Sequence, residues 1–258
     1  MLRSKNGGDQ MIYIAGSTYG CFDRFLENDT IKCLTQEDYL IIIGNFGFFH
    51  SKEETITKII ENEILDLMAQ MPYTILFIDS ADEHIEAIKT YPVEFWNGGK
   101  VHRIRSNIAH LMRGQVFEIE GKKIFALGGA ISSHPETMNK PIDQQNHNLD
   151  SLPSKSELAE GWSNLERNDL NVDIVITYTP TTEAIRCCCP MPQDAPYGGE
   201  ILPFLEQIQN LVQYKSWYFG LLHTDEYYSF ELSPLGKYCA EKKMHPVWLK
   251  VLSVDSTQ

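Results

Sequence analysis

An acidic turn that ends in a histidine is the first place in this sequence where side chains able to do chemistry gather. Together with one histidine far along the chain, its members are Asp79, Asp82, Glu83, His84 and His223. Carboxylate and imidazole groups of this kind are ligands for a single divalent cation. Residues so close in sequence usually point in different directions at a helix start, where acids in the first turn are favourable by themselves. We therefore expect this turn to have a structural role.

Cys21 offers a different chemistry, because a cysteine thiolate is a nucleophile when a base lies beside it. Such a site requires the loops to bring Cys21 to face His223 or Tyr178. Nothing next to Cys21 in the sequence would activate its thiol, and cysteine is commonly a small buried hydrophobe. We expect Cys21 to be such a buried residue.

Basic side chains in the middle of the chain supply a third type of chemistry. Three arginines lie there: Arg103, Arg105 and Arg113. We expect them to form a solvated face of a second sheet, and they would bind an anion if they faced the site. Three histidines show no spacing typical of metal ligands: His102, His110 and His134.

Apolar runs before these residues predict the strands that position them. The runs are Met11–Ala15, Tyr39–Ile43 and Thr74–Ile78. Between the last two, six apolar residues have the spacing of one helical face: Ile56, Ile59, Ile60, Ile64, Leu67 and Met68. This pattern predicts an amphipathic helix that packs that face on the sheet. Strand, helix and strand imply crossover connections, and α/β proteins place their sites at the carboxyl ends of such strands.

From residue 101 onward the pattern predicts a second, more antiparallel layer. Short strands are expected at Val101–Arg105, Gln115–Ile119 and Lys123–Leu127, with a hairpin turn at Glu120-Gly121. Residues 131–153 are polar and lack periodicity, which predicts a long loop or flap. A capping-box pattern at Ser154 and Glu157 begins a helix that runs to about Asn168. Strands at Val172–Thr177 and Trp217–Gly220 and a helix at Ile201–Val212 complete the prediction.

Length and composition favour one large soluble domain. With 258 residues, of which 43% are hydrophobic, we expect a domain at residues 11–235, a flexible start at 1–10 and an extension at 236–258. No apolar run approaches the roughly 20 residues of a membrane span, and the start lacks the apolar part of a signal peptide. A net charge of −13 argues against nucleic acid as a partner. Six cysteines, three of them consecutive, are expected to be free thiols of a cytoplasmic protein.

Four loops and three longer stretches carry a resemblance to a known family. The loops are Gly16–Gly20, Gly44–Gly47, Ser80–Glu83 and Gly220–His223, and the stretches are YPVEFWNGGKVHRIRSNIAHLMRGQVFEIEGKKIFALGGA, NLERNDLNVDIVITYTP and WYFGLLH. Over most of Met11–Phe230 the chain resembles the calcineurin-like metallophosphoesterases of the small bacterial type. The resemblance implies an α/β fold, a four-layer αββα sandwich of two mixed β-sheets flanked by helices, with the site at the carboxyl ends of the central strands.

In that family the loops hold two divalent cations, such as Mn or Fe and Zn. The family sequences are Gly-Asp-x-His-Gly, Gly-Asp, Gly-Asn-His-Glu, a later His, and Gly-His-x-His. A bridging carboxylate and other anionic or imidazole ligands are needed because two cations about 3.5–4 Å apart repel one another. At the seven ligand positions this chain has Ser17, Tyr19, Asn45, Ala81, Tyr178, Leu221 and His223, and Asp82 stands at the position of the catalytic acid. Only His223 keeps a family ligand, so we expect no catalytic residues, no metal and no other cofactor.

Three classes of function remain open. A pseudo-phosphoesterase with a binding, regulatory or scaffolding role is the simplest account of six replaced ligands beside retained glycines. Its neutral pocket suits a nucleotide-like or phosphorylated small molecule, held without being cut, and would be lined by Ser17, Tyr19, Asn45, Asp82, Tyr178 and His223. If packing has instead filled the site, the protein contacts another protein or another copy of itself. The third class is an active phosphoesterase with an atypical or rebuilt metal site.

Overall fold

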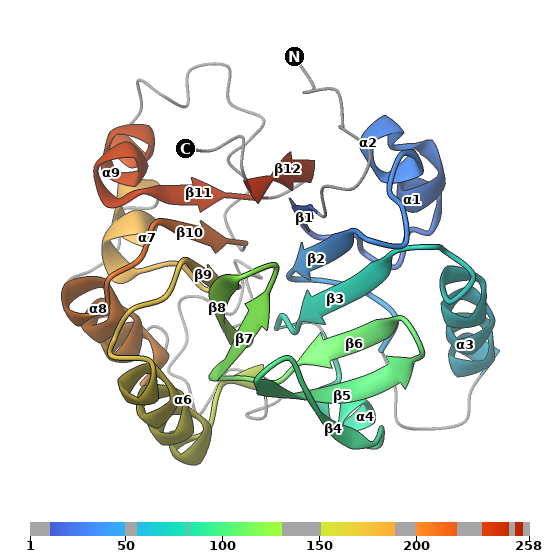
Figure 1. Ribbon diagram of the computed structural model, residues 1–258, viewed down its shortest axis with the longest axis horizontal. Helices are drawn as coiled ribbons and strands as arrows, with labels where there is room; N and C mark the ends of the chain where they lie inside the picture. Colours follow the sequence, from blue (N-terminus) through green and yellow to red (C-terminus); the bar gives the residue numbers. More distant parts are fainter. Residues whose placement is uncertain are drawn as a thin grey trace.

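The computed structural model describes residues 11–49, 56–81, 83–130, 151–188, 200–220, 234–247 and 251–254. The protein has an α/β fold in which two mixed β-sheets are flanked by helices (Figure 1). The expected flexible start at 1–10 lies outside these residues, as does most of the expected flap, at 131–150. Four residues named above also lie outside them: Asp82, His134, Leu221 and His223. Within the described ranges, no helix is long and apolar enough to cross a membrane.

The first sheet has seven strands in the described part of the chain, in the order β12-β1-β2-β3-β6-β5-β4. Their bounds are β1 Ile12–Ala15, β2 Tyr39–Ile43, β3 Thr74–Ile78, β4 Val93–Trp96, β5 Gly99–Arg105, β6 Ile108–Leu111 and β12 Val251–Ser253. β1, β2, β3 and β6 run parallel, whereas β12, β5 and β4 pair antiparallel with their neighbours. The three strands predicted before residue 79 are confirmed to within one residue.

The second sheet has the strand order β11-β10-β9-β8-β7. Its bounds are β7 Gln115–Ile119, β8 Lys122–Leu127, β9 Ile174–Thr177, β10 Ser216–Phe219 and β11 Met244–Pro246. The predicted hairpin turn is confirmed, since Glu120 and Gly121 between β7 and β8 have φ of 52° and 66°, as a tight turn of the I′ type requires. The prediction that the second layer is more antiparallel is wrong, because β8, β9, β10 and β11 are parallel. Val101–Arg105 lies in β5 of the first sheet, where it pairs with the short strand β6 that the sequence pattern did not separate.

The helices occupy the outer faces of the two sheets (Figure 1). Their bounds are α1 Asp23–Glu27, α2 Asp29–Lys32, α3 Ile56–Met68, α4 Ile85–Ile88, α6 Lys155–Arg167, α7 Thr182–Cys188, α8 Ile201–Leu211 and α9 Pro234–Lys242. The capping box predicted for α6 is confirmed, because the Ser154 side chain accepts from the Glu157 N–H and the Glu157 carboxylate accepts from the Ser154 N–H.

The core has one layer between the sheets and one outside each sheet. In β2, Ile41 and Ile43 face the second sheet, and Leu40 and Ile42 face the helices of the outer layer. Such strands are apolar at consecutive positions because both of their faces are buried. This explains why β1, β2 and β3 were readable from the sequence.

Helix α3 packs with only part of the face that was expected: Met68 is buried and Ile64 is partly buried against the core outside the first sheet. Leu65 and Met68 are buried against the first sheet, together with Glu61. Four members of the predicted packing face are exposed instead: Ile56, Ile59, Ile60 and Leu67. The expectation was wrong for these four residues because apolar residues lie on both sides of this helix, and contact with the sheet buries Leu65 beside Met68.

The described part of the expected C-terminal extension at 236–258 takes part in both sheets. β11 pairs with β10, and β12 pairs antiparallel with β1, with Tyr13 opposite Ser253 and Ala15 opposite Val251. Each strand forms one edge of its sheet.

Candidate functional site

The loops singled out in the sequence follow the carboxyl ends of β1, β2, β3, β9 and β10. The loops after β1 and β2 are in direct contact, since the N–H groups of Thr18 and Tyr19 both donate to the Asn45 carbonyl at 2.9 Å. Gly20 and Gly47 have φ of +67° and +82°, and a Cβ at Gly20 would lie 2.4 Å from the Gly47 carbonyl oxygen. Only glycine fits this crossing of two backbones.

Glu83 joins the loops after β2 and β3. Its buried carboxylate accepts from the Gly47 N–H at 3.0 Å and from the Ser80 N–H at 2.6 Å, and it also contacts the Ser80 hydroxyl. Burial raises the pKa of Glu83, against the lowering effect of these hydrogen bonds. Glu83 is therefore structural, but not as the acid of a first helical turn that was expected: α4 begins at Ile85, and Glu83 joins two loops before it.

The ring of Tyr178 fills the space between the ends of the two sheets. A Cβ at Gly44, after β2, would lie 2.2 Å from Tyr178 Cε2, and a Cβ at Gly220, after β10, would lie 2.6 Å from Tyr178 Cδ2. The same Cβ at Gly44 would be 3.3 Å from Ser17 Oγ. Tyr178 is buried and belongs to the core between the sheets. The ring therefore lies against both glycines, beside Ser17.

The described residues of the expected pocket do not all face one another. Ser17, Asn45 and Tyr178 are buried, and Ala81 packs partly buried against the core between the sheets. Tyr19 is 43% exposed, has a positive φ of 53°, and lies 5.7 Å below the Arg24 guanidinium. Its ring therefore points to the surface rather than toward Tyr178.

These residues do not fit a pair of divalent cations. Ser17 carries no charge, Asn45 carries a neutral amide, and Tyr178 brings ring carbons to the two glycines. Cations held close together need carboxylate and imidazole ligands that offset their repulsion. Among the described residues, no three His, Cys, Asp or Glu side chains gather as metal ligands do.

The cation cluster and the cysteine site considered in the sequence are placed only in part. Asp79 binds Arg113, and Glu83 binds the loop after β2, so the two carboxylates are engaged in separate contacts. Asp82 and His223 lie outside the described residues. Cys21 is exposed, so its expected burial is wrong: it lies in the turn after β1, where its N–H donates to the Thr18 carbonyl.

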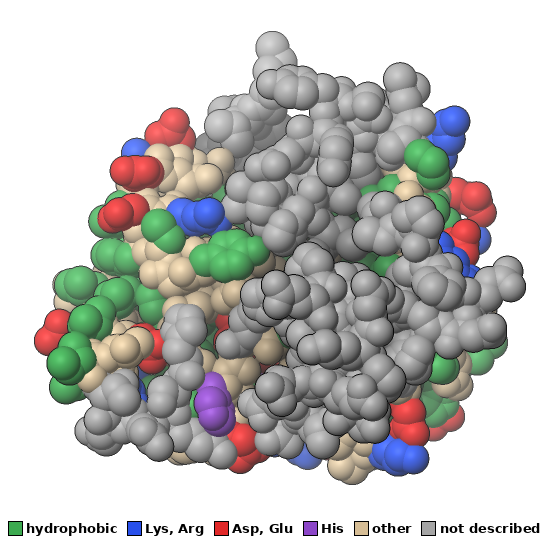
Figure 2. Space-filling view, turned by 180° about the vertical axis from the view of Figure 1, so that it is seen from behind, with side chains coloured by type: hydrophobic (Ala, Val, Ile, Leu, Met, Phe, Trp, Pro, Cys, Tyr) green, Lys and Arg blue, Asp and Glu red, His purple; other side chains and the backbone are tan. Residues whose placement is uncertain are grey.

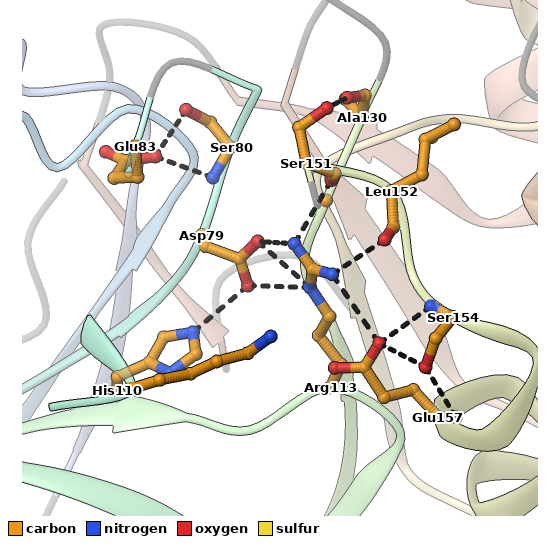
Figure 3. A network of polar contacts seen from close by, with 12 residues as sticks. Asp79, Ser80, Glu83, His110, Arg113, Ala130, Ser151, Leu152, Ser154 and Glu157 are labelled. Carbon is orange, nitrogen blue, oxygen red and sulfur yellow. Dashed lines mark hydrogen bonds and ion pairs between the residues drawn. The ribbon is translucent and has the colours of Figure 1, made fainter. Parts of the chain in front are cut away.

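A buried polar network, which sequence reasoning missed, lies beside this site (Figure 3). The carboxylate of Asp79, directly after β3, accepts from Arg113 Nη2 at 2.6 Å and from Arg113 Nε at 3.1 Å. His110 Nε2 lies 3.0 Å from the other carboxylate oxygen, and His110 Nδ1 lies 3.0 Å from His102 Nδ1. All four side chains are buried. The solvated position expected for Arg113 is therefore wrong.

Burial and neighbouring charges shift the pKa values of Asp79 and His102 in this network. Burial alone would raise the pKa of Asp79, but the Arg113 charge and the hydrogen bonds from His110 and Arg113 outweigh it and hold the pKa well below its usual range. An ionised Asp79 requires His110 Nε2 to donate, and in the neutral form of His110 the remaining Nδ1 accepts from the Nδ1–H of His102. Burial, followed by the nearby His110, lowers the pKa of His102 to about 4.

Arg113 also links the two halves of the fold. Its guanidinium donates to the carbonyls of Ser151 at 3.1 Å and Leu152 at 2.9 Å, in the segment that leads into α6 (Figure 3). The Ser151 hydroxyl donates to the Ala130 carbonyl, and the Gly129 N–H donates to the Asp79 carbonyl at 2.8 Å. The end of β3 in the first sheet is thereby tied to the segment after β8 in the second.

A signal for part of this network does exist in the sequence. His102 and His110 lie directly opposite one another in the antiparallel pair of β5 and β6. Recognising the turn at Ser106-Asn107 would have placed them together. Arg103 and Arg105, by contrast, pair with the more exposed acids Glu94 and Asp66 at the rim of the first sheet.

We predict that Asp79→Asn lowers the free energy of unfolding by about 3–5 kcal/mol, because it leaves the buried Arg113 without its counter-charge. Asp66→Asn is the matched control: it also removes a carboxylate 2.6 Å from an arginine, but at an exposed position, where such pairs contribute at most about 1 kcal/mol. Urea unfolding at pH 7 measures both. Equal losses in the two variants would show that Arg113 does not depend on Asp79.

We predict that stability falls as the pH is lowered from about 6.5 to about 4, in part because of His102. Its pKa is near 6.5 in the unfolded chain and about 4 in the folded protein, so the unfolded chain takes up the proton first. The loss from this group amounts to about 3 kcal/mol at the end of that range. His102→Asn keeps an N–H donor near Nδ1 and removes the titration, so its stability should fall less steeply in urea unfolding at a series of pH values.

The difference between the two proteins isolates His102, because the other titrating groups are shared. They include His245, whose pKa burial lowers, and Glu83, whose raised pKa acts in the opposite direction. Parallel stability curves for the wild type and His102→Asn would contradict the prediction.

We predict that Gly220→Ala and Tyr178→Ala compensate one another. Gly220→Ala forces a methyl group into the ring and should cost about 1–3 kcal/mol, and Tyr178→Ala leaves a cavity and should cost about 3–5 kcal/mol. The double variant should lose less than the sum by about 0.5–3 kcal/mol in a thermal or urea unfolding cycle. Gly121→Ala is the control, because its Cβ meets nothing within 4 Å and should add to Tyr178→Ala without coupling. If the stability losses of Gly220→Ala and Tyr178→Ala simply add in the double variant, the Tyr178 ring does not lie against Gly220.

No family model matches this chain, and no curated protein matches it. The structure accordingly bears on the resemblance only at the level of architecture: an α/β fold, two mixed sheets with helices on their outer faces, and glycines at the ends of the central strands.

Proposed function

We propose that this protein is a relative of the calcineurin-like phosphoesterases that does not hydrolyse phosphate esters and acts through protein contacts. The observation that carries the proposal is the position of the Tyr178 ring, which lies against Gly44 and Gly220 at the ends of strands from both sheets. In the family resemblance, these glycine loops are the ones that hold the two metals. An aromatic ring between these loops supports a role in packing rather than in catalysis.

The charge of the loops supports the same proposal. Ser17 and Asn45 stand where the family has acids, and two buried carboxylates that follow β3 are already engaged: Asp79 with Arg113, and Glu83 with the N–H groups of Gly47 and Ser80. Phosphoester hydrolysis by metals requires cations that polarise the phosphoryl oxygens and lower the pKa of a bound water. The engaged carboxylates are not available to bind such cations without breaking the contacts between the loops.

Protein contact is favoured over the binding of a small ligand by the burial of the pocket residues. Ser17, Asn45 and Tyr178 offer little surface to a nucleotide-like or phosphorylated molecule. The proposal also places the protein in a reducing compartment such as the cytoplasm, which the free thiols of Cys21, Cys33, Cys187 and Cys239 support.

We predict no turnover of p-nitrophenyl phosphate or bis(p-nitrophenyl) phosphate by the purified wild type in Mn²⁺, and no stoichiometric metal in elemental analysis. The reason is the lack of a bridging carboxylate at Asn45 and the ring at Gly44 and Gly220. Turnover that rises with bound Mn²⁺ and is lost in Asn45→Ala would contradict the proposal and favour a rebuilt metal site.

A thermal-shift screen of nucleotides without metal separates protein contact from small-molecule binding. A ligand at 100 times its dissociation constant stabilises the folded protein by about 2.7 kcal/mol, which such a screen detects. We expect no shift. A shift that disappears in Tyr178→Ala, while remaining in Gly121→Ala, would return the pocket to a binding role.

A further inference from the structure

Helix α3 carries an apolar stripe that faces solvent. The stripe consists of Ile56, Ile59, Ile60 and Leu67, which are 77%, 56%, 49% and 48% exposed. Offsets of three, four and eleven residues place them along one side of a helix. Helix α3 lies at the right in Figure 1 and therefore at the left in Figure 2, which views the molecule from behind. Hydrophobic side chains gather at that left margin in Figure 2. Single exposed apolar residues are common on proteins, but four on one helical face form a patch of the type that marks interaction sites.

The stripe is fixed in its outward orientation by contacts on the other side of α3. Leu65 and Met68 are buried in the core outside the first sheet. Asp66 and Asn62 both bind Arg105 of β5, at 2.6 Å and 3.1 Å. Turning the stripe inward would remove two buried apolar side chains from the core and break both contacts to Arg105.

The charged residues along the stripe are acidic. Glu63 is exposed and lies three residues after Ile60 and four before Leu67, and the exposed Asp66 lies beside Leu67. Lys58 lies two residues after Ile56, and residues two apart on a helix do not share a face. The surface therefore combines apolar anchors with negative charge.

These charges decide which partner fits. A second copy of the chain would bring its own Glu63 to the same contact, on molecules that each carry a net charge of −13. Membrane surfaces rich in anionic lipid are disfavoured for the same reason. An amphipathic helix with lysine or arginine beside its apolar face complements both the anchors and the acids, in the manner of a helix laid on an apolar surface.

We propose that the α3 stripe is the docking site for a basic amphipathic helix of a partner protein. The inference rests on the proposed function in one respect: it assigns a surface to the protein contacts proposed there. Ile56, Ile60 and Leu67 supply the apolar contact, and Glu63 pairs with a cation beside the apolar face of the partner helix.

Fluorescence anisotropy with two labelled 14-residue probes tests the proposal on the full-length protein. One probe is a helix of leucine and lysine with an apolar face, and the other has glutamate at every lysine position. The leucine–lysine probe should bind the wild type, and the leucine–glutamate probe should bind at least tenfold more weakly. Ile60→Gln/Leu67→Gln and Glu63→Lys should each weaken binding of the leucine–lysine probe at least tenfold.

Matched controls separate docking on the stripe from general attraction of a cationic peptide. Val93→Gln/Phe95→Gln removes two exposed apolar residues from β4, and Asp29→Lys reverses an exposed charge on α2. Both variants should bind the leucine–lysine probe within twofold of the wild type. Circular dichroism melts confirm that all variants fold.

Several outcomes would overturn the inference. They are no binding of the leucine–lysine probe, equal weakening by the stripe and control variants, a dimer in sedimentation velocity that Ile60→Gln/Leu67→Gln dissociates, and stripe-dependent binding to vesicles containing phosphatidylserine. The result is independent of the proposed loss of hydrolysis. Turnover by the wild type would overturn that proposal and leave probe binding intact, whereas an inactive wild type without stripe-dependent binding would overturn only the docking site.

Discussion

The buried ion pair of Asp79 and Arg113 is the contact on which the joining of the two sheets depends. Removing two charges from water costs several kcal/mol for each ion, and only close pairing with further hydrogen bonds offsets that cost. Here the carboxylate also receives His110, and the guanidinium also binds the carbonyls of Ser151 and Leu152. Because its partners come from β3, β6 and the segment before α6, the pair is satisfied in one arrangement of the sheets, and other arrangements leave a charge unpaired.

The ring of Tyr178 and the pair of Asp79 and Arg113 complete the end of the molecule in different ways. The ring fills volume between Gly44 and Gly220, where any side chain larger than hydrogen would collide with it. The ion pair fixes direction, because its hydrogen bonds have angular preferences that apolar packing lacks. Among the described residues at this end, the loops after β1, β2 and β3 are thus held by packing and by directed polar contacts.

The sequence made the strands and the strand-end loops predictable, but not the contacts between distant segments. β1, β2 and β3 were readable because both faces of each strand are buried, which leaves unbroken apolar runs. Arg113 was taken as solvated because its counter-charge, Asp79, stands 34 residues earlier, and an arginine is exposed unless such a partner exists. The rotation of α3 was missed because Leu65 and Ile60 are equally apolar, and only the sheet decides between them. The sequence showed a tyrosine after the strand at 174–177, whereas the position of its ring against Gly44 and Gly220 required the structure.

The pairing of β12 with β1 has a consequence for biosynthesis. Tyr13 and Ser253 are neighbours in the sheet but lie 240 residues apart in the chain. At a translation rate of roughly 5–20 residues per second, β1 leaves the ribosome roughly 12–48 s before its outer partner is made. During that interval β1 is an edge strand, with backbone groups available to any other extended chain. The newborn protein therefore depends on β2 to hold β1 in register, and the other edge of β1 stays open until β12 has been made.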